Sequence, residues 1–419
     1  MLRSAQEPSV TMSLESAAVA VAGEIRRQEF VEVFAHHDAD GIAAGSILCH
    51  AMLRAGIRFR LRIRRELSSA ELAGDSALLL CDIGAGMEDL RDDAMVVDHH
   101  LPLFRGEFHA NPRLAGIDGD RELSAAGTAY IVAQQMGDNR DLAGLAICGI
   151  IGDGQEMAGK NLEIFNEAIA NGIIDPGRGV MLPGRDMAER WYMATSPYLA
   201  GISGQEQHIG DLIGQAQDKA KGSDTPRLDI LLSRIVLDAA PATTAGSLQR
   251  IYGDTYHLRR EVIDDGHALA AVIDACGKTG RGDIGATLCL RSSHYASEAW
   301  EIARRHRLMV IEAVAAAKPA EGVAGVFEVA DAAVVSDVAD ILARDRDASS
   351  PVLVYARSGT GCRVSARTPA GSGELGPLIR QLALSCGGTG GGHIRRAGAT
   401  IPCDRIAMFA KGWQEALAA

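Results

Sequence analysis

The sequence predicts an α/β protein: a larger N-terminal domain with a parallel sheet, a helical linker and a smaller C-terminal α/β domain. Three observations favour this fold class. Short apolar runs that suit buried strands alternate with stretches of helical periodicity in the first 150 or so residues. Several of these runs end in acids or histidines, and parallel α/β sheets collect ligands at the carboxyl ends of their strands. A long helical stretch then precedes a second set of strands.

Composition bounds the class of function. The chain has 419 residues, of which 47% are hydrophobic, so it can bury a large core in two or three domains. It has no apolar run of about 18 residues and no signal-peptide order at its start, so we expect a cytoplasmic protein with no membrane partner. Eight scattered cysteines without CxxC spacing predict buried free thiols. The net charge of -12 argues against non-specific coating of nucleic acid but allows a local basic groove.

The expected elements follow in chain order. In the N-terminal part they are a helix over 14–26, a strand over 30–34, a helix over 42–53, an arginine-rich strand over 57–65, a short helix near 68–72, strands over 77–81 and 94–97, a helix opening at 124 and an apolar segment over 142–151. Further on they are helices over 162–170, 205–220, 244–275 and 294–317, Gly- and Pro-rich turns near 176–183, strands over 351–355 and 362–367, and a helix over 375–384.

The first polar cluster follows the strand over 30–34. His36, Asp38 and Asp40 occupy alternating positions, which in an extended chain face one side. Two buried carboxylates repel each other unless a cation lies between them, so a metal ion is the simplest explanation. Gly41 then permits a sharp turn into the next helix. His37 alternates away from the cluster, and we interpret it as structural.

Three later segments repeat this pattern. Asp82 ends the strand over 77–81, Asp98, His99 and His100 end the next strand, and Asp153 stands between two glycines after the apolar segment. Taken alone, Asp153 favours an ordinary Asp-Gly turn. Because strands of a parallel sheet deliver their ends to one edge, the convergence of the clusters is a stronger signal than any one of them.

Two basic regions leave alternatives open. The strict apolar/basic alternation over 57–65 fits an edge strand whose charges deter aggregation, and it also fits a surface for nucleic acid or a partner protein. Near the C-terminus, the glycine run could let backbone N–H groups approach a phosphate, or it could be a flexible loop. Arginines that flank it could pair with phosphate oxygens. The candidate substrate-binding residues are Ser365, Arg367, Gly390, Gly391, Gly392, His393 and Arg396.

These motifs resemble those of a known superfamily. His36-x-Asp38-x-Asp40-Gly41, Asp82, Asp98-His99-His100 and Asp153 look like the four motifs of the DHH phosphoesterases, in the family's order. Gly390 to His393, followed by Ala397-Gly398, look like the glycine-rich signature of the DHH-associated C-terminal domain. The family usually has alanine where Arg396 stands. Residues 274–286 are similar to a stretch of archaeal RecJ-like nucleases, which makes a RecJ-like exonuclease the favoured interpretation.

The resemblance implies a centre of two Mn²⁺ ions, with Mg²⁺ as the alternative. One ion would be held by His36, Asp38 and Asp82, and the other by Asp40, Asp82, His99 and Asp153. Carboxylates mixed with imidazole and no thiolate suit these ions better than structural zinc. We expect His100 to contact the scissile phosphate or transfer a proton, and Asp98 to orient a ligating imidazole.

The predicted function is two-metal hydrolysis of phosphodiester bonds in single-stranded DNA or RNA. Alternatives are a hydrolase of short oligoribonucleotides, cyclic dinucleotides or phosphoadenosine phosphate, and a non-catalytic scaffold of replication or repair. For the chain as a whole, the expected partners are single-stranded DNA or RNA and a replication or repair protein, such as the GINS complex or a helicase. The predicted domains are an N-terminal extension over 1–29, a DHH catalytic domain over 30–175, a helical linker or insert over 176–320 and a DHH-associated substrate-binding domain over 321–419.

Overall fold

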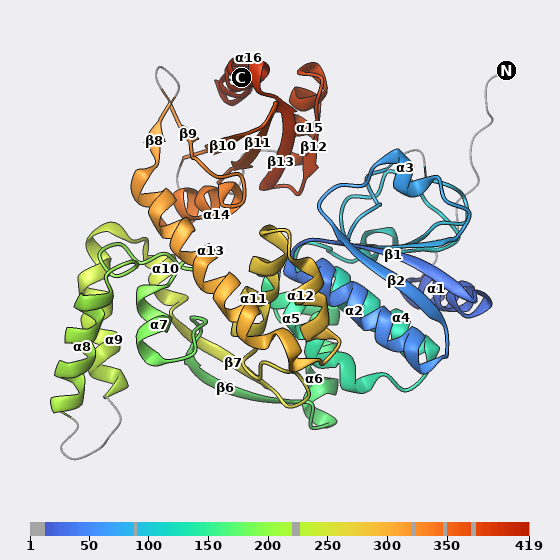
Figure 1. Cartoon of the computed structure of the whole chain (residues 1–419), viewed down its shortest axis with the longest axis horizontal. Coiled ribbons are helices and arrows are strands. Elements are labelled where there is room, and N and C mark those ends of the chain that lie inside the picture. The colour runs from blue at the N-terminus through green and yellow to red at the C-terminus, as the bar shows by residue number, and fades with distance from the viewer. Residues whose placement is uncertain are drawn as a thin grey trace. The chain divides into compact units, whose positions relative to one another are not determined.

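The computed structural model describes residues 13–87, 90–219, 227–320, 324–346, 350–369 and 374–418. The chain folds into two compact units, whose elements are labelled in Figure 1. Unit 1 comprises the described residues up to Asp175 together with His257–Ala299, and unit 2 comprises Pro176–Tyr256 and the described residues from Trp300 onward. No helix among the described residues is both long enough and apolar enough to cross a membrane.

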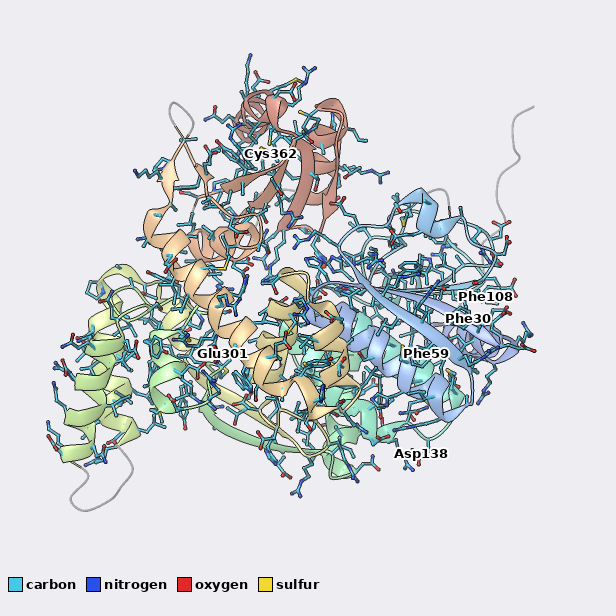
Figure 2. The ribbon with its side chains drawn as sticks, in the orientation of Figure 1. Phe30, Phe59, Phe108, Asp138, Glu301 and Cys362 are labelled. Atoms are coloured by element: carbon cyan, nitrogen blue, oxygen red, sulfur yellow. The ribbon has the colours of Figure 1, made fainter. Side chains whose placement is uncertain are left out.

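Unit 1 is organised around a five-stranded parallel sheet in the order β2-β1-β3-β4-β5. Its strands are β1 (Phe30–His36), β2 (Arg58–Arg64), β3 (Ala77–Cys81), β4 (Met95–Val97) and β5 (His109–Ala110). β1 lies between β2 and β3, with register partners that run from Phe30 and Arg58 to His36 and Arg64. Figure 2 labels Phe30 on β1 and Phe59 on β2. The predicted parallel α/β class is confirmed.

Helices surround this sheet. They are α1 (Leu14–Arg27), α2 (Ala39–Arg54), α3 (Ser69–Leu72), α4 (Ala125–Met136), α5 (Ala143–Gly152), α6 (Gly159–Ala170), α11 (Gly266–Lys278) and α12 (Gly282–Cys289), with short 3-10 turns η1 (Pro112–Ala115), η2 (Arg140–Leu142) and η4 (Ser293–Tyr295). α2 contacts β1, β2 and β3, and α4 and α5 pack against α2. Nearly every residue of α2 is buried, which explains its run of alanine, glycine and aliphatic side chains. These contacts fix α2, α4 and α5, the helices that carry site residues.

The arginine-rich strand β2 lies at the edge of the sheet. Arg60 and Arg62 both form ion pairs with Glu32 of β1, and Arg64 pairs with Glu71 of α3. The Arg62 guanidinium also lies 5.5 Å from the centre of the Phe34 ring. Because these arginines already have partners within unit 1, the structure favours the edge-strand interpretation of residues 57–65.

Unit 2 contains a mixed six-stranded sheet in the order β12-β13-β11-β10-β9-β8. Its strands are β8 (Lys318–Pro319), β9 (Val326–Glu328), β10 (Val352–Ser358), β11 (Gly361–Arg367), β12 (Thr389–Gly392) and β13 (Arg396–Pro402). Alternate residues of β10 face two cores. Leu353 and Tyr355 pack with α15 (Leu375–Ser385) and α16 (Ile406–Ala418). Val352, Val354 and Ala356 pack with α13 (Ala296–Ala316) and α14 (Val335–Asp340).

The remaining elements of unit 2 are mostly helical. They are α7 (Met187–Tyr192), α8 (Glu206–Asp218), α9 (Leu228–Ala239), η3 (Ala240–Ala242), α10 (Ala245–Gln249), α13 (Ala296–Ala316), α14 (Val335–Asp340), the π-helical turn η5 (Ile341–Arg346), α15 (Leu375–Ser385), η6 (Cys403–Arg405) and α16 (Ile406–Ala418), of which α13 begins within unit 1. A further core around Trp191, Leu212 and Ile235 joins α7, α8 and α9. The helical middle of the chain is therefore confirmed.

Three local predictions were wrong. Residues 244–275, expected as helix, contain strand β7 (Tyr252–Leu258), and the turns expected near 176–183 overlap strand β6 (Ile174–Val180), with which β7 pairs. The glycine run forms strand β12, which pairs antiparallel with β13. The two compact units divide the chain differently from the predicted domains, whose boundaries stay predictions.

Candidate active site

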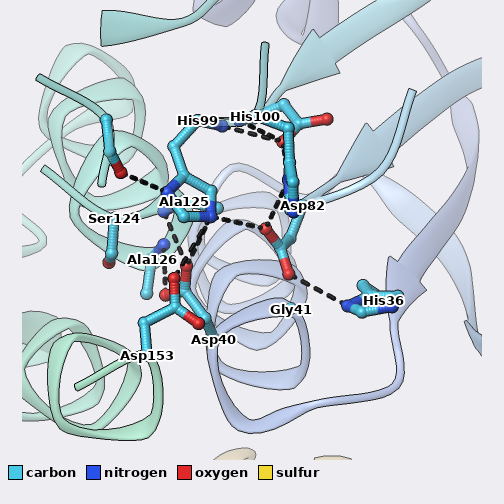
Figure 3. Close-up of polar contacts among 12 residues, drawn as sticks. His36, Asp40, Gly41, Asp82, His99, His100, Ser124, Ala125, Ala126 and Asp153 are labelled. Atoms are coloured by element: carbon cyan, nitrogen blue, oxygen red, sulfur yellow. Dashed lines mark hydrogen bonds and ion pairs between the residues drawn. The ribbon is translucent and has the colours of Figure 1, made fainter. Parts of the chain in front are cut away.

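The carboxyl ends of the unit 1 strands bring together the acids and histidines that the sequence singled out. They come from the end of β1 and the start of α2, from the residue after β3, from the segment after β4 and from the residue after α5. The residues are His36, Asp38, Asp40, Asp82, Asp98, His99, His100 and Asp153. Figure 3 shows most of their side chains directed toward one small volume.

The backbone around the first motif differs from the extended chain that we expected. β1 ends at His36, and Asp38 is the N-cap of α2, where its side chain accepts a hydrogen bond of 3.0 Å from the Gly41 N–H. Asp40 therefore points into the site from the first turn of α2, not from a strand. Gly41 lies within the helix and makes no sharp turn; a Cβ there would lie 2.6 Å from the His36 carbonyl oxygen. Close packing, not turning, requires this glycine.

A first group of metal-ligand atoms forms around His36. Its Nδ1 lies 2.8 Å from Asp38 Oδ2 and 3.2 Å from Asp82 Oδ2. The ligand atoms of these three residues all lie within 4.8 Å of one another. Burial alone would lower the pKa of His36, but the Asp38 and Asp82 carboxylates raise it well above its ordinary value.

A second group forms around His99. Its Nε2 lies 3.2 Å from Asp153 Oδ2, 3.3 Å from Asp82 Oδ1 and 3.9 Å from Asp40 Oδ2. Asp82 thus offers one oxygen to each group (Figure 3). The His99, Asp40 and Asp82 side chains are at most 1% exposed, so solvent does little to screen the charges of this second group.

A hydrogen bond to the His99 ring determines which ring nitrogen faces the carboxylates of the second group. His99 Nδ1 lies 2.6 Å from the Gly119 carbonyl oxygen, which can only accept, so Nδ1 carries the proton and donates it. In the neutral ring, Nε2 then presents a lone pair to three carboxylates. Burial alone would lower the pKa of His99, but Asp153, Asp82 and Asp40 raise it well above its ordinary value. Either a proton or a metal ion must occupy this position.

The carboxylates also lack sufficient neutralisation. Within the described residues, the buried Asp82 Oδ1 accepts no hydrogen bond of acceptable geometry. Burial, Asp153 and Asp82 raise the pKa of Asp40 well above its ordinary value. Burial and the nearby Asp38 and Asp82 carboxylates raise the pKa of Asp153 to about 6, although His99 acts in the opposite direction. Oxygen and imidazole donors with surplus negative charge fit hard divalent cations such as Mn²⁺ or Mg²⁺.

Asp40 and Asp82 are held in place by the backbone. The oxygens of Asp40 accept hydrogen bonds from the N–H groups of Ala125 (2.7 Å) and Ala126 (2.9 Å) at the start of α4, where the helix dipole favours an anion. Asp82 has a left-handed backbone with a φ of 59°. For a residue other than glycine this conformation costs on the order of 1 kcal/mol, and such strain concentrates at functional sites.

Asp98 and His100 form a pair beside the two groups. Asp98 Oδ1 accepts from the His99 and His100 N–H groups at 2.7 and 3.1 Å and lies 2.8 Å from His100 Nδ1, while Oδ2 accepts from the Ala85 N–H at 2.9 Å. Asp98 therefore orients the ring of His100, whereas Gly119 orients that of His99. Burial alone would lower the pKa of His100, but Asp98 raises it.

Sequence reasoning missed His37. Its Nδ1 lies 3.0 Å from His36 Nε2, and the two rings meet edge to face at 4.4 Å. The period-two argument placed His37 on the opposite face, but the strand ends before it. Through this contact His37 can fix the tautomer of His36 and leave Nδ1 facing the carboxylates.

A separate basic cluster lies in unit 2. Arg367 is 8% exposed; it pairs with Asp340 at 2.7 and 3.1 Å and donates to Ser365 Oγ at 2.8 Å. Arg396 Nε lies 3.8 Å from Asp340 Oδ1. Burial alone would raise the pKa of Asp340, but Arg367 and Arg396 lower it well below its ordinary value. This cluster contains three of the predicted substrate-binding residues, Ser365, Arg367 and Arg396, together with their partner Asp340.

Two further arginines of this cluster were not predicted. Arg344 pairs with the buried Asp345 at 2.8 Å, and Arg250 donates to Ser196 Oγ at 3.3 Å. Burial and the neighbouring Arg344 lower the pKa of Arg250 to about 10. A half-buried guanidinium near other positive charges favours a bound anion. Neither arginine stands in a motif, so nothing in the sequence places it near Arg367.

The glycines of β12 have a role in strand packing, in addition to the phosphate binding that the sequence predicts. Gly390 and Gly392 lie in β12. A Cβ added at either glycine would lie too close to atoms of the neighbouring strand β13. At Gly391 an added Cβ would meet no atom within 4 Å. The His393 N–H donates to the Arg396 carbonyl at 2.7 Å and extends the pairing of the two strands. Phosphate binding by these residues stays a prediction.

Comparison with known proteins agrees with this architecture. Residues 321–419 match the DHHA1 domain family. An uncharacterized protein of Methanocaldococcus jannaschii is 27% identical over 414 residues, which cover 91% of this chain and 92% of that protein. The two sequences therefore align over nearly their whole length.

Solved structures show the same fold at low identity. RecJ of Thermus thermophilus, in complex with Mn²⁺, has a TM-score of 0.58 and 18% identity over 99% of this chain. The match spans only 55% of the RecJ chain. CDC45 of Entamoeba histolytica has a TM-score of 0.62 and 10% identity, and covers 98% of this chain and 99% of its own. Residues 321–419 therefore carry a DHHA1 domain, the chain shares its fold with these structures, and the His/Asp groups of unit 1 form a candidate metal-binding site.

Proposed function

We propose that this protein is a divalent-metal-dependent phosphodiesterase, and specifically a RecJ-like exonuclease that hydrolyses single-stranded DNA or RNA. One observation carries the proposal: the lone pair of His99 Nε2 faces the carboxylates of Asp40, Asp82 and Asp153 at 3.2 to 3.9 Å. A scaffold has no use for such a cluster, because without cations its charges destabilise the fold.

The two groups of donors suggest two ions, Mn²⁺ or Mg²⁺. His36, Asp38 and Asp82 would hold one ion, and Asp40, Asp82, His99 and Asp153 the other, with Asp82 shared. Structures of Thermus thermophilus RecJ in complex with Mn²⁺ and with Mg²⁺ support this choice of ions. When bound, such a pair of cations supplies Lewis-acid stabilisation of the charge that develops on a phosphoryl group.

The chain's own residues would orient the reactants. His100 Nδ1 is fixed by Asp98 at 2.8 Å, which leaves Nε2 of the partly exposed ring to contact a phosphate oxygen or to transfer a proton. Asp98 would stabilise the protonated form of His100, because its carboxylate raises the pKa of that imidazole. The Gly119 carbonyl would keep His99 in the tautomer whose Nε2 is a ligand.

Unit 2 would bind the phosphates of the substrate. Ser365, Arg367 and Arg396, with the glycine run and His393, are the predicted contacts, and the positions of Arg250 and Arg344 add both arginines to this proposal. Aromatic residues make up only 4% of the chain, so recognition should depend on phosphates more than on base stacking. Binding should therefore weaken as salt rises. The GINS complex or a helicase as partner stays a prediction.

Digestion of end-labelled single-stranded DNA and RNA tests the proposal. We expect stepwise shortening with Mn²⁺ and none after chelation by EDTA. A length series from dinucleotides to long strands separates the alternatives. Activity that vanishes beyond a few nucleotides would assign the protein to small-nucleotide hydrolysis. Absence of any metal-dependent cleavage would favour the non-catalytic scaffold.

A further inference from the structure

Helix α5 carries a feature that the proposed site does not yet explain. Its last turns contain Gly149 and Gly152, directly before Asp153. Glycine is unfavourable in a helix interior, so a glycine there needs a reason. A Cβ added at Gly149 would lie far inside 3.0 Å of two atoms, Asp40 Oδ1 and the Cβ of Ala126. Real Cβ atoms essentially never come so close, so one of the neighbours would have to move.

Asp40 has little freedom to move away. Its two oxygens accept hydrogen bonds from the Ala125 and Ala126 N–H groups at 2.7 and 2.9 Å, and the residue is 0% exposed. A methyl group at position 149 would break these bonds or push α5 away from α2 and α4. Asp153, the C-cap of α5, is one helical turn after Gly149, and its N–H donates to the Gly149 carbonyl at 3.0 Å. Either movement would therefore change the separation of the Asp40 and Asp153 carboxylates.

We propose that Gly149 is a positioning residue of the second donor group: its missing side chain lets Asp40 and Asp153 approach one cation from adjacent helices. The inference rests on the proposed metal centre. It predicts a selective effect, because the donor group around His36 does not include Asp40. A glycine needed only for helix packing would show no such selectivity.

Calorimetric titration with Mn²⁺ tests the selectivity. We expect the wild type to bind two ions and Gly149→Ala to bind one with wild-type affinity and the other at least about 10-fold more weakly. Gly23→Ala in α1 is the matched control, because an added Cβ there meets no atom within 4 Å, and it should bind both ions normally. Two ions with unchanged affinity in Gly149→Ala would overturn the inference. A wild type that binds no Mn²⁺ would instead refute the proposed function.

A double-mutant cycle keeps the test decisive if Gly149→Ala folds poorly. The thermal midpoints of Asp40→Ala, Gly149→Ala and the double variant are compared without metal. If the methyl group collides with the Asp40 carboxylate, removal of that carboxylate should restore much of the stability lost in Gly149→Ala. Purely additive losses would place the conflict at Ala126 alone and overturn the inference.

Discussion

The two units differ in the charged side chains that they bring together. Unit 1 gathers carboxylates around His36 and His99, and within the described residues no lysine or arginine forms an ion pair with Asp40, Asp82 or Asp153. Unit 2 gathers guanidinium groups, of which Arg367 and Arg344 pair with Asp340 and Asp345. The donor groups of unit 1 therefore lack positive charges. In the arginine cluster of unit 2, two carboxylates neutralise part of the positive charge and the rest remains.

This difference indicates two kinds of ligand. Buried like charges without partners cost several kcal/mol in effective terms, so they persist only where a ligand or a function compensates. Metal ions would compensate unit 1, and phosphate groups would add to the existing pairs of unit 2. Substitutions in the donor groups of unit 1 should consequently abolish activity, whereas substitutions in the arginine cluster of unit 2 should weaken substrate binding.

Asp82→Ala should have the largest effect. It removes the carboxylate shared by both donor groups, so we expect activity to fall by about 10³-fold or more and Mn²⁺ binding to be lost at both positions. Hydrolysis assays and calorimetry check this. Asp93→Ala, in an exposed ion pair of unit 1, should leave both unchanged. Retained activity in Asp82→Ala would mean that another group does the chemistry.

His100→Asn should lower kcat by about 10²-fold while two Mn²⁺ ions still bind, because His100 is proposed to supply a proton or a phosphate contact and is not a proposed ligand. His208→Asn removes a partly exposed histidine of unit 2 and should change neither quantity. Loss of a metal ion in His100→Asn would show instead that His100 is a ligand, as its closeness to Asp82 and Asp98 would permit.

Arg367→Ala should raise KM for single strands by about 30- to 100-fold and leave kcat nearly unchanged, since it would remove a proposed phosphate contact and no reacting group. Arg357→Ala, on neighbouring β10 and half exposed, is the matched control. A fall in kcat with constant KM would place the function of Arg367 in the chemical step.

Asp340→Asn should destabilise the protein by about 2 kcal/mol, because it leaves Arg367 without its carboxylate partner. Arg367 and Arg396 hold the pKa of Asp340 below its ordinary value of 3.8, against the effect of burial. The stabilisation is therefore fully present above about pH 4 and is lost as the pH falls through the lowered pKa. Urea denaturation at pH 7 and near pH 3 should show a smaller difference between variant and wild type at the lower pH. An equal difference would exclude this ion pair as the cause.

Arg62→Ala should have the smallest effect, a loss of stability of about 1 kcal/mol or less with unchanged affinity for single strands. The residue pairs with Glu32 and stacks on Phe34, so it serves the edge of the sheet. Denaturation and an anisotropy titration measure the two quantities. A marked drop in affinity would revive β2 as a nucleic-acid surface.

Topology explains which parts of the site were predictable. Asp82, His99 and Asp153 follow separate apolar segments, and a parallel sheet brings such ends together whatever the details of the loops. The direction of Asp40 was predicted for the wrong reason, because Asp38 caps helix α2, which begins at Ala39, one residue before Asp40. The same early helix start brought His37 against His36.

Other features carried no local signal. Arg250 and Arg344 lie about a hundred positions apart, and only the fold of unit 2 brings them together. Strand β7 was missed because Tyr252 and Tyr256 are four residues apart, a spacing that also fits one face of a helix. Strand β12 was missed because glycines show no alternation of apolar and polar side chains.

The stoichiometry of Mn²⁺ binding to the purified wild-type chain at neutral pH tests the central claim most directly. Two ions per chain, with release of protons as His99 and the carboxylates give up theirs, is the predicted result. One ion, or none at millimolar Mn²⁺, would contradict the account of unit 1 as a cluster built for a pair of cations.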